Sequence, residues 1–147
     1  MAQVRRAEAR WQGDLTTGTG EVSAVSSGVF TALPTTWKAR TEASEGLTSP
    51  EELLATALAS CFSMASSNEL AKAGFPTAGS DVSVDITADR REKGWTVLSA
   101  HITLRAKVPG VDEATFQEAV EKARVGCPIS RAIAGNVEIT LDAALEA

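Results

Sequence analysis

The chain has 147 residues, 44% of them hydrophobic, and a formal net charge of −5 at pH 7. This length and composition suffice for a hydrophobic core, so we expect residues 1–147 to fold as a single domain without disulfide cross-links. The acidic balance, without a long cluster of Lys or Arg, argues against nucleic-acid binding, which needs a basic surface.

The cysteine content and the N-terminal sequence indicate the compartment. Two cysteines are too few for a secreted disulfide scaffold, and residues 1–8 lack the apolar segment of a signal peptide. The most apolar stretch, residues 53–65, is too short to cross a bilayer and contains Thr56, Ser60 and Ser63. We therefore expect a cytoplasmic protein without a membrane anchor, whose partners are small molecules or proteins.

The first third of the chain has the pattern of short antiparallel strands. Residues 7–12 alternate between apolar and polar side chains, and Gly13 and Asp14 predict a turn. A second run, rich in Thr, Gly and Val, ends near Gly28. Residues 35–41 are expected to be extended as well.

A long helix is the clearest element of the sequence. Ser49 is the expected N-cap, and Pro50 takes the first helical position. The helix should continue to about Lys72 and end at Gly74. Its surface is mostly small or aliphatic, with a thin stripe of hydroxyl groups, so it belongs in a core or a subunit interface.

The second half alternates regularly between strand and helix patterns. We expect strands at residues 82–86, 98–108 and 137–143, and helices at residues 112–126 and 128–134. Strands at both ends of the chain with helices between them predict an α+β fold.

Cys61 has two interpretations. It lies on the apolar part of the long helix, where burial would raise the pKa of its thiol and suppress the thiolate. Many free cysteines are buried for packing alone. A reactive Cys61 would need a cation beside it, and Arg40 is the candidate, because a guanidinium stays charged when partly buried. The alternative for Arg40 is a solvated strand residue.

Glu51 is also ambiguous. An acidic residue in a first helical turn is favoured by the helix dipole, but Glu52 suits the capping role and leaves Glu51 able to hold an arginine. Ten residues separate Glu51 from Cys61, which corresponds to about 15 Å along a helix. If both belong to one site, Glu51 acts through a long arginine or comes from a second copy. The site therefore predicts a homodimer.

Cys127 directly precedes a helix that begins with Pro128. Backbone N–H groups at that helix start would favour a thiolate and make Cys127 a good resolving or leaving group; a chance cysteine at a break is the alternative. If both sulfurs face one cavity, oxidation of the first can be captured by the second as a disulfide. The sole histidine, His101, falls in the polar phase of its strand, so we expect neither a Cys–His pair nor a metal or cofactor.

Several motifs together carry a family resemblance. Residues 49–53 and 59–65, with Gly126-Cys127-Pro128-Ile129-Ser130, resemble the OsmC (osmotically inducible protein C) branch of the OsmC/Ohr family. Further matching segments are residues 11–14, 18–20, 108–112 and 138–142. The resemblance implies an intertwined homodimer, in which strands from both subunits form antiparallel sheets around central helices.

The resemblance also implies an activity. Members of this family reduce organic hydroperoxides, and hydrogen peroxide less efficiently, in defence against oxidative or osmotic stress. The sites would lie at the subunit interface, and an external dithiol such as a lipoylated protein would be the reductant.

The functional residues of the family transfer individually. The peroxide-attacking cysteine matches Cys61, the resolving cysteine matches Cys127, the arginine matches Arg40 and the glutamate matches Glu51. Leu58 departs from the pattern, since members often have His or Tyr there.

Two alternatives remain open. The chain could be a redox sensor in which oxidation of Cys61 and Cys127 reshapes a dimer surface without turnover. It could also be a dimeric carrier for an apolar ligand, with both thiols inert.

Overall fold

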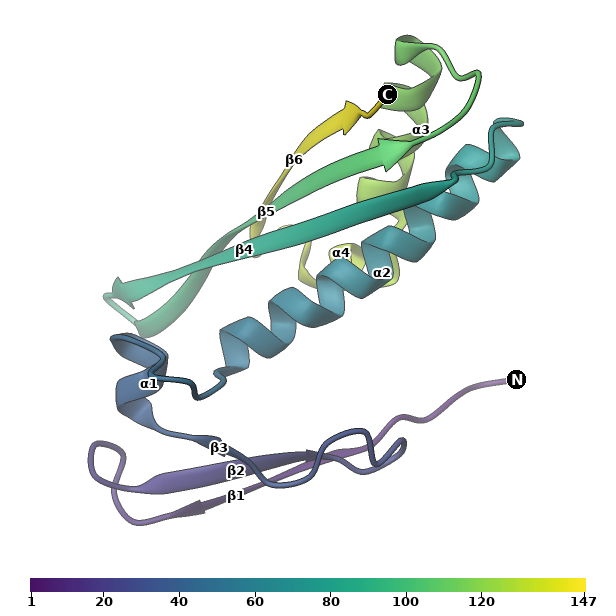
Figure 1. The fold of residues 1–147 in the computed structure, drawn as a ribbon. Helices are drawn as coiled ribbons and strands as arrows, with labels where there is room; N and C mark the ends of the chain where they lie inside the picture. Colours follow the sequence, from purple (N-terminus) through teal and green to yellow (C-terminus); the bar gives the residue numbers. More distant parts are fainter. The chain divides into compact units, whose positions relative to one another are not determined.

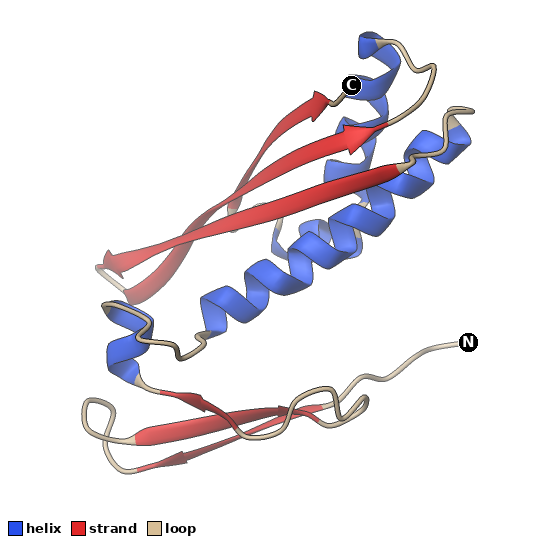
Figure 2. Cartoon of the chain, viewed as in Figure 1, coloured by secondary structure: helices blue, strands red, loops and turns tan.

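The computed structural model describes residues 1–147, which form two compact units, residues 1–53 and residues 54–147. Each unit contains a three-stranded sheet, and helices accompany the sheets in both (Figures 1 and 2). The expected α+β class is confirmed. That the whole chain is a single domain stays a prediction.

The N-terminal unit is built on an antiparallel sheet of β1 (Ala7–Gln12), β2 (Thr19–Ala24) and β3 (Leu33–Thr35). The Asp14 carboxylate shapes the β1–β2 turn, because it accepts backbone N–H groups of the following residues. The hydroxyl of Thr17, followed by these backbone donors, holds the pKa of Asp14 well below its usual range. The expected strands on either side of Gly13 are therefore present.

Residues 37–41 are helical, so the expectation of an extended segment at 35–41 was wrong beyond Thr35. The short helix α1 (Trp37–Thr41) is capped by Thr36, whose hydroxyl accepts the Ala39 N–H at 3.0 Å. Pairing with β2 ends at Thr35, so the chain beyond it has no strand to join. Arg40 consequently lies on a helix and is not a strand residue.

The long helix α2 (Pro50–Lys72) has the expected limits. Ser49 is its N-cap, with its hydroxyl accepting the Glu52 N–H at 3.1 Å, and Gly74 follows the helix with φ of 92°. The buried residues recur at every fourth position and are Leu58, Phe62, Ser66 and Leu70. No helix in the chain is both long and apolar enough to span a bilayer.

The sheet of the C-terminal unit contains β4 (Gly79–Arg91), β5 (Gly94–Lys107) and β6 (Glu138–Leu145). β4 and β5 form the expected antiparallel hairpin, whereas β6 runs parallel to β5. The sheet is therefore mixed, where we had expected antiparallel pairing. Parallel strands need a long crossover connection, and residues 108–137 between β5 and β6 provide one.

The connecting helices are α3 (Glu113–Gly126) and α4 (Pro128–Ile133). Alternate residues of β5, from Ala100 to Ala106, are buried and share one hydrophobic core with Phe62 of α2 and Phe116 of α3. Cys127 belongs to the same core, and the partly buried Cys61 packs against it. The packing of α2 and α3 on one sheet therefore positions the two sulfur atoms.

Candidate active site

Cys61 and Cys127 lie in direct contact in the C-terminal unit. Their Sγ atoms are 2.7 Å apart, and both are free thiols. Cys127 is fully buried, whereas Cys61 is partly exposed. The expectation that the two sulfurs meet is confirmed, and the more accessible one belongs to Cys61.

Each cysteine is positioned by a different element. Cys61 adjoins the buried Phe62 on α2. Cys127 is the residue between α3 and α4: its N–H closes α3 by donating to the Ala123 carbonyl at 2.9 Å, and it serves as the N-cap of α4. The contact joins residues 66 positions apart in the chain, so tertiary packing creates it.

The two thiols have opposite pKa shifts. Burial raises the pKa of Cys61, the adjacent Cys127 raises it further, and the Ile129 N–H only partly offsets these effects. Burial also acts to raise the pKa of Cys127, but the contact with Cys61 and the N–H and hydroxyl groups of Ser130 outweigh it, so its pKa is lowered. The pair therefore favours the thiolate at Cys127, and Cys61 needs a further cation to ionise readily.

Arg40 and Glu51 form a second pair, within the N-terminal unit. Arg40 Nη2 and Nε donate to Glu51 Oε1 at 2.8 and 3.0 Å, and Nε also lies 3.2 Å from Oε2. The side chains are 31% and 12% exposed, respectively. These contacts confirm that Glu51 holds an arginine, and they leave the Nη1 donors of Arg40 for another acceptor.

Two residues near these pairs were missed by the sequence analysis. The ring centroid of Trp37 lies 5.6 Å from Cζ of Arg40, on the same face of α1. Ser130 lies buried in α4, three residues after Cys127. Both spacings, i to i+3, are visible in the sequence, but neither indicates a role until the helix that contains it is known.

The other residues singled out earlier lie elsewhere. Leu58, which stands where members of the family often have His or Tyr, is completely buried in the core. His101 is exposed on β5, with Nδ1 2.7 Å from the Thr140 hydroxyl. No cluster of three or more His, Cys, Asp or Glu side chains is placed to hold a metal ion.

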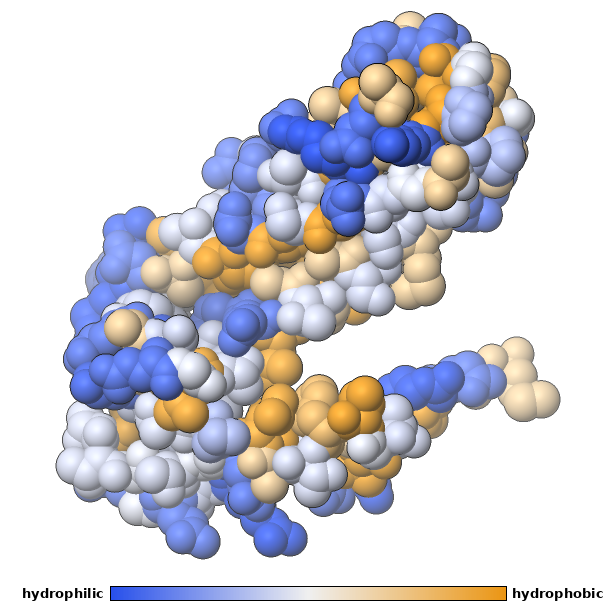
Figure 3. All heavy atoms as spheres, viewed as in Figure 1, coloured by the Kyte–Doolittle hydropathy of each residue, from blue (hydrophilic) through white to orange (hydrophobic).

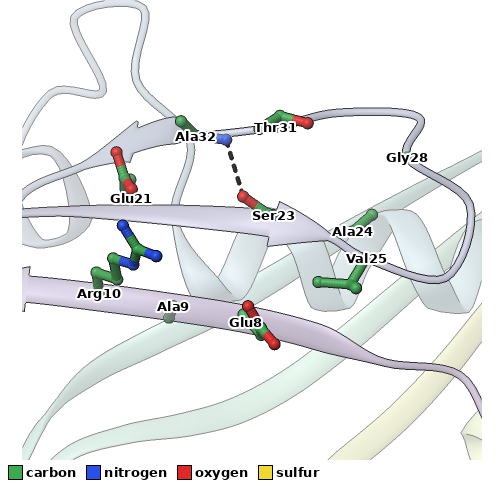
Figure 4. Close-up of a pocket in the computed structure, with 10 residues that line it drawn as sticks. All are labelled: Glu8, Ala9, Arg10, Glu21, Ser23, Ala24, Val25, Gly28, Thr31 and Ala32. Carbon is green, nitrogen blue, oxygen red and sulfur yellow. Dashed lines mark hydrogen bonds between the residues drawn. The ribbon is translucent and has the colours of Figure 1, made fainter.

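A cavity of about 400 Å³ lies in the N-terminal unit, between residues of β1, β2 and the loop that follows (Figure 4). Arg10 and Glu21 face each other there across the two strands, and the Ser23 hydroxyl accepts the Ala32 N–H at 2.9 Å. None of the four candidate residues lines this cavity. No cysteine is among the residues that line it.

Comparisons with known proteins identify the family to which the chain belongs. Residues 41–142 match the family described as OsmC-like protein. The chain is 38% identical over 138 residues to peroxiredoxin OsmC of Escherichia coli strain K12, covering 94% of each chain. It is 35% identical over 96 residues to an organic hydroperoxide resistance protein of Xanthomonas axonopodis pv. citri, covering 64% of this chain and 65% of that protein.

A solved structure shows the same fold. The organic hydroperoxide resistance protein OhrB of Bacillus subtilis aligns with a TM-score of 0.73 at 22% identity, covering 95% of this chain and 98% of the other. Together with the match over residues 41–142, the similarity over nearly the whole length to peroxiredoxin OsmC shows that the chain belongs to the OsmC-like protein family.

Proposed function

We propose that this protein is a thiol-dependent peroxidase that reduces organic hydroperoxides, and hydrogen peroxide less efficiently, through Cys61 and Cys127. The observation that carries the proposal is the contact between the two sulfurs, 2.7 Å apart in an apolar core. The names of the relatives, a peroxiredoxin and organic hydroperoxide resistance proteins, support the same chemistry.

Cys61 is the proposed peroxidatic residue because it is the more accessible sulfur. Its thiolate attacks one peroxide oxygen, so that an S–O bond forms and the O–O bond breaks. The second oxygen leaves with the alkyl group and takes up a proton as an alcohol. Cys61 is left as a sulfenic acid.

Cys127 is the proposed resolving residue. Its thiolate attacks the Cys61 sulfur, an S–S bond forms, the S–O bond breaks, and hydroxide leaves and is protonated to water. The lowered pKa of Cys127 supplies the thiolate for this step. Two thiols of an external dithiol, such as a lipoylated protein, then reduce the disulfide and become a disulfide themselves.

Arg40 is proposed to supply the cation that Cys61 needs. The guanidinium would favour the Cys61 thiolate and orient the peroxide, and Glu51 would hold it in position. Each pKa unit by which the arginine offsets burial corresponds to about 1.4 kcal/mol. Loss of Arg40 should therefore slow the first step severely.

We further propose that the working unit is a homodimer. Ten helical residues, about 15 Å, separate Glu51 from Cys61, which favours a site completed by a second copy. Every residue of β1 is exposed in the single chain, including Trp11. Hydrophobic residues gather on the surface of the N-terminal unit (Figure 3). Light scattering should therefore give the mass of two chains; a monomer would contradict this part of the proposal.

The apolar surroundings of the sulfurs favour bulky alkyl hydroperoxides as substrates. The core around the cysteines consists of Leu, Ile, Val, Phe and Ala side chains, which exclude water and contact hydrocarbon groups. The need for a reduced dithiol between turnovers fits a reducing compartment, and we propose the cytoplasm.

The test is steady-state consumption of cumene hydroperoxide with dihydrolipoamide as the reductant. The wild-type protein should turn over many equivalents, Cys61→Ser should abolish turnover, and Ser63→Ala, two positions further along α2, should retain it. Consumption that stops after about one equivalent, despite excess dithiol, would identify a sensor instead. An unchanged rate in Cys61→Ser would exclude the proposed chemistry.

A further inference from the structure

The hydroxyl of Ser130 is the one buried side-chain oxygen or nitrogen without a hydrogen-bond partner. The residue is only 2% exposed. Buried polar groups in folded proteins are nearly always hydrogen-bonded, because an unsatisfied one loses its bonds to water without compensation. This hydroxyl therefore calls for an explanation.

The position of Ser130 in α4 limits its potential partners. Cys127 is the N-cap of α4 and Ser130 is the third helical residue, the position from which a side chain reaches back to the N-cap. The backbone N–H of Cys127 already donates to the Ala123 carbonyl, and the Cys127 carbonyl already accepts the Arg131 N–H, each at 2.9 Å. The N-cap atom that remains for the Ser130 hydroxyl is the Cys127 sulfur.

A thiol and a thiolate differ greatly as acceptors. A neutral sulfur is a weak acceptor, whereas hydrogen bonds to ionised groups are roughly twice as strong as neutral ones. A hydroxyl that is unsatisfied beside a thiol is thus ready to donate once the sulfur ionises.

We propose that Ser130 is a positioning residue for the resolving sulfur, donating its hydroxyl hydrogen to Cys127 when Cys127 is a thiolate. This inference rests on the proposed function. Burial acts to raise the pKa of Cys127, and the contact with Cys61 is the main cause that lowers it. The N–H and hydroxyl groups of Ser130 are the next causes that lower it.

The same hydrogen bond would act twice in each cycle. It would first hold the Cys127 thiolate for attack on the Cys61 sulfenic acid, with release of hydroxide as water. When a thiolate of the external dithiol attacks the Cys61 sulfur, the S–S bond breaks and Cys127 leaves as a thiolate. A leaving thiol of lower pKa departs faster, so Ser130 would also favour reduction of the disulfide.

A positioning role and a purely structural role have different consequences for Ser130→Ala. If Cys127 is a thiol, the substitution removes an unsatisfied hydroxyl and should not lower stability. At pH values above the pKa of Cys127, it removes a donor from the thiolate and should lower stability. If the role of Ser130 were purely structural, Ser130→Ala would lower the stability of the protein by the same amount at every pH.

The direct test is a titration of Cys127 by NMR of its ¹³Cβ nucleus, in a Cys61→Ala background where Cys127 is the only cysteine. Ser130→Ala should move the midpoint to higher pH, so that the thiolate population well below the midpoint falls about tenfold. Ser130→Thr keeps a hydroxyl and should restore the midpoint. The matched control is Ser66→Ala, which removes an equally buried hydroxyl that is bonded to the Ser63 carbonyl.

A single-turnover measurement with both cysteines present gives a second readout. Ser130→Ala should leave the rate of Cys61 oxidation unchanged and slow disulfide formation about threefold, since higher nucleophilicity partly offsets the smaller thiolate population. If the wild-type protein is an active peroxidase but Ser130→Ala leaves the titration midpoint of Cys127 unchanged, this inference is overturned and the proposed function is not. A wild-type protein without peroxide turnover would instead overturn the proposed function, whatever the titration shows.

Discussion

The Sγ atoms of Cys61 and Cys127 lie 2.7 Å apart, but the two sulfurs have unequal surroundings. Cys61 is partly exposed and its pKa is raised, whereas Cys127 is fully buried and its pKa is lowered. The accessible sulfur can meet a peroxide, and the buried sulfur can meet only its neighbour. The difference in exposure supports an order of roles in which Cys61 reacts first and Cys127 resolves, whereas the raised pKa of Cys61 is the reason why the proposed mechanism needs a cation there.

Removal of Cys127 should lower the pKa of Cys61. Burial is the main cause of the raised pKa, and Cys127 adds to it through its hydrogen bond and its charge. In Cys127→Ala the second contribution disappears, so the thiolate of Cys61 should form at lower pH than in the wild-type protein. The pH profile of Cys61 alkylation by iodoacetamide measures this; a profile that stays in place or moves to higher pH would contradict it.

Glu51→Gln should slow peroxide reduction. The carboxylate bonds two nitrogens of Arg40, and hydrogen bonds between charged groups contribute about 1.5–3 kcal/mol, equivalent to roughly a tenfold or larger loss of rate. Stopped-flow measurement of Cys61 oxidation gives the rate constant. Glu52→Gln is the matched control, because it removes the neighbouring carboxylate. Equal rates for the two variants would mean that Glu51 does not serve the reaction.

Trp37→Leu should have a smaller effect in the same measurement. The ring faces the Arg40 guanidinium, and a partly exposed cation–π contact contributes about 0.5–1 kcal/mol, equivalent to a rate loss of about two- to fivefold. Trp37→Phe keeps an aromatic face and should lose less. If the leucine variant reacts at the wild-type rate, Trp37 does not position Arg40.

Gly20→Ala should destabilise the N-terminal sheet. Gly20 pairs with Trp11 across β1 and β2, and an added Cβ would lie 2.5 Å from the indole ring. Overpacking of this kind costs about 1–3 kcal/mol. Gly79→Ala in β4 meets no atom within 4 Å and is the control for the change of residue type. Urea denaturation gives the free energy of unfolding of both variants. Similar values for Gly20→Ala and Gly79→Ala would contradict the prediction, because the indole ring would then make room for the added Cβ without loss of stability.

The elements with strong local determinants could be predicted from the sequence. Ser49, Pro50 and Gly74 mark the limits of α2, and alternation of side chains marks the β4–β5 hairpin. The sequence also provided the four candidate residues, and the structure joins them as two pairs. That all four form one site stays a prediction.

The remaining features depend on information that local patterns do not contain. α1 has five residues, too few for a helical pattern to recur, and its cap Thr36 is β-branched and typical of strands. Alternation in β6 does not specify the direction of pairing, which is parallel to β5 across the α3–α4 crossover. Ser130 gains significance only because α3 ends and α4 begins at Cys127.

Intact-mass spectrometry after one equivalent of cumene hydroperoxide, without reductant, tests the proposed cysteine chemistry most directly. The wild-type chain should lose two hydrogen atoms, as one disulfide between Cys61 and Cys127 forms, and Cys127→Ser should instead gain one oxygen atom at Cys61. A wild-type chain whose mass is unchanged, or that gains oxygen without forming the disulfide, would contradict the assignment of both cysteines.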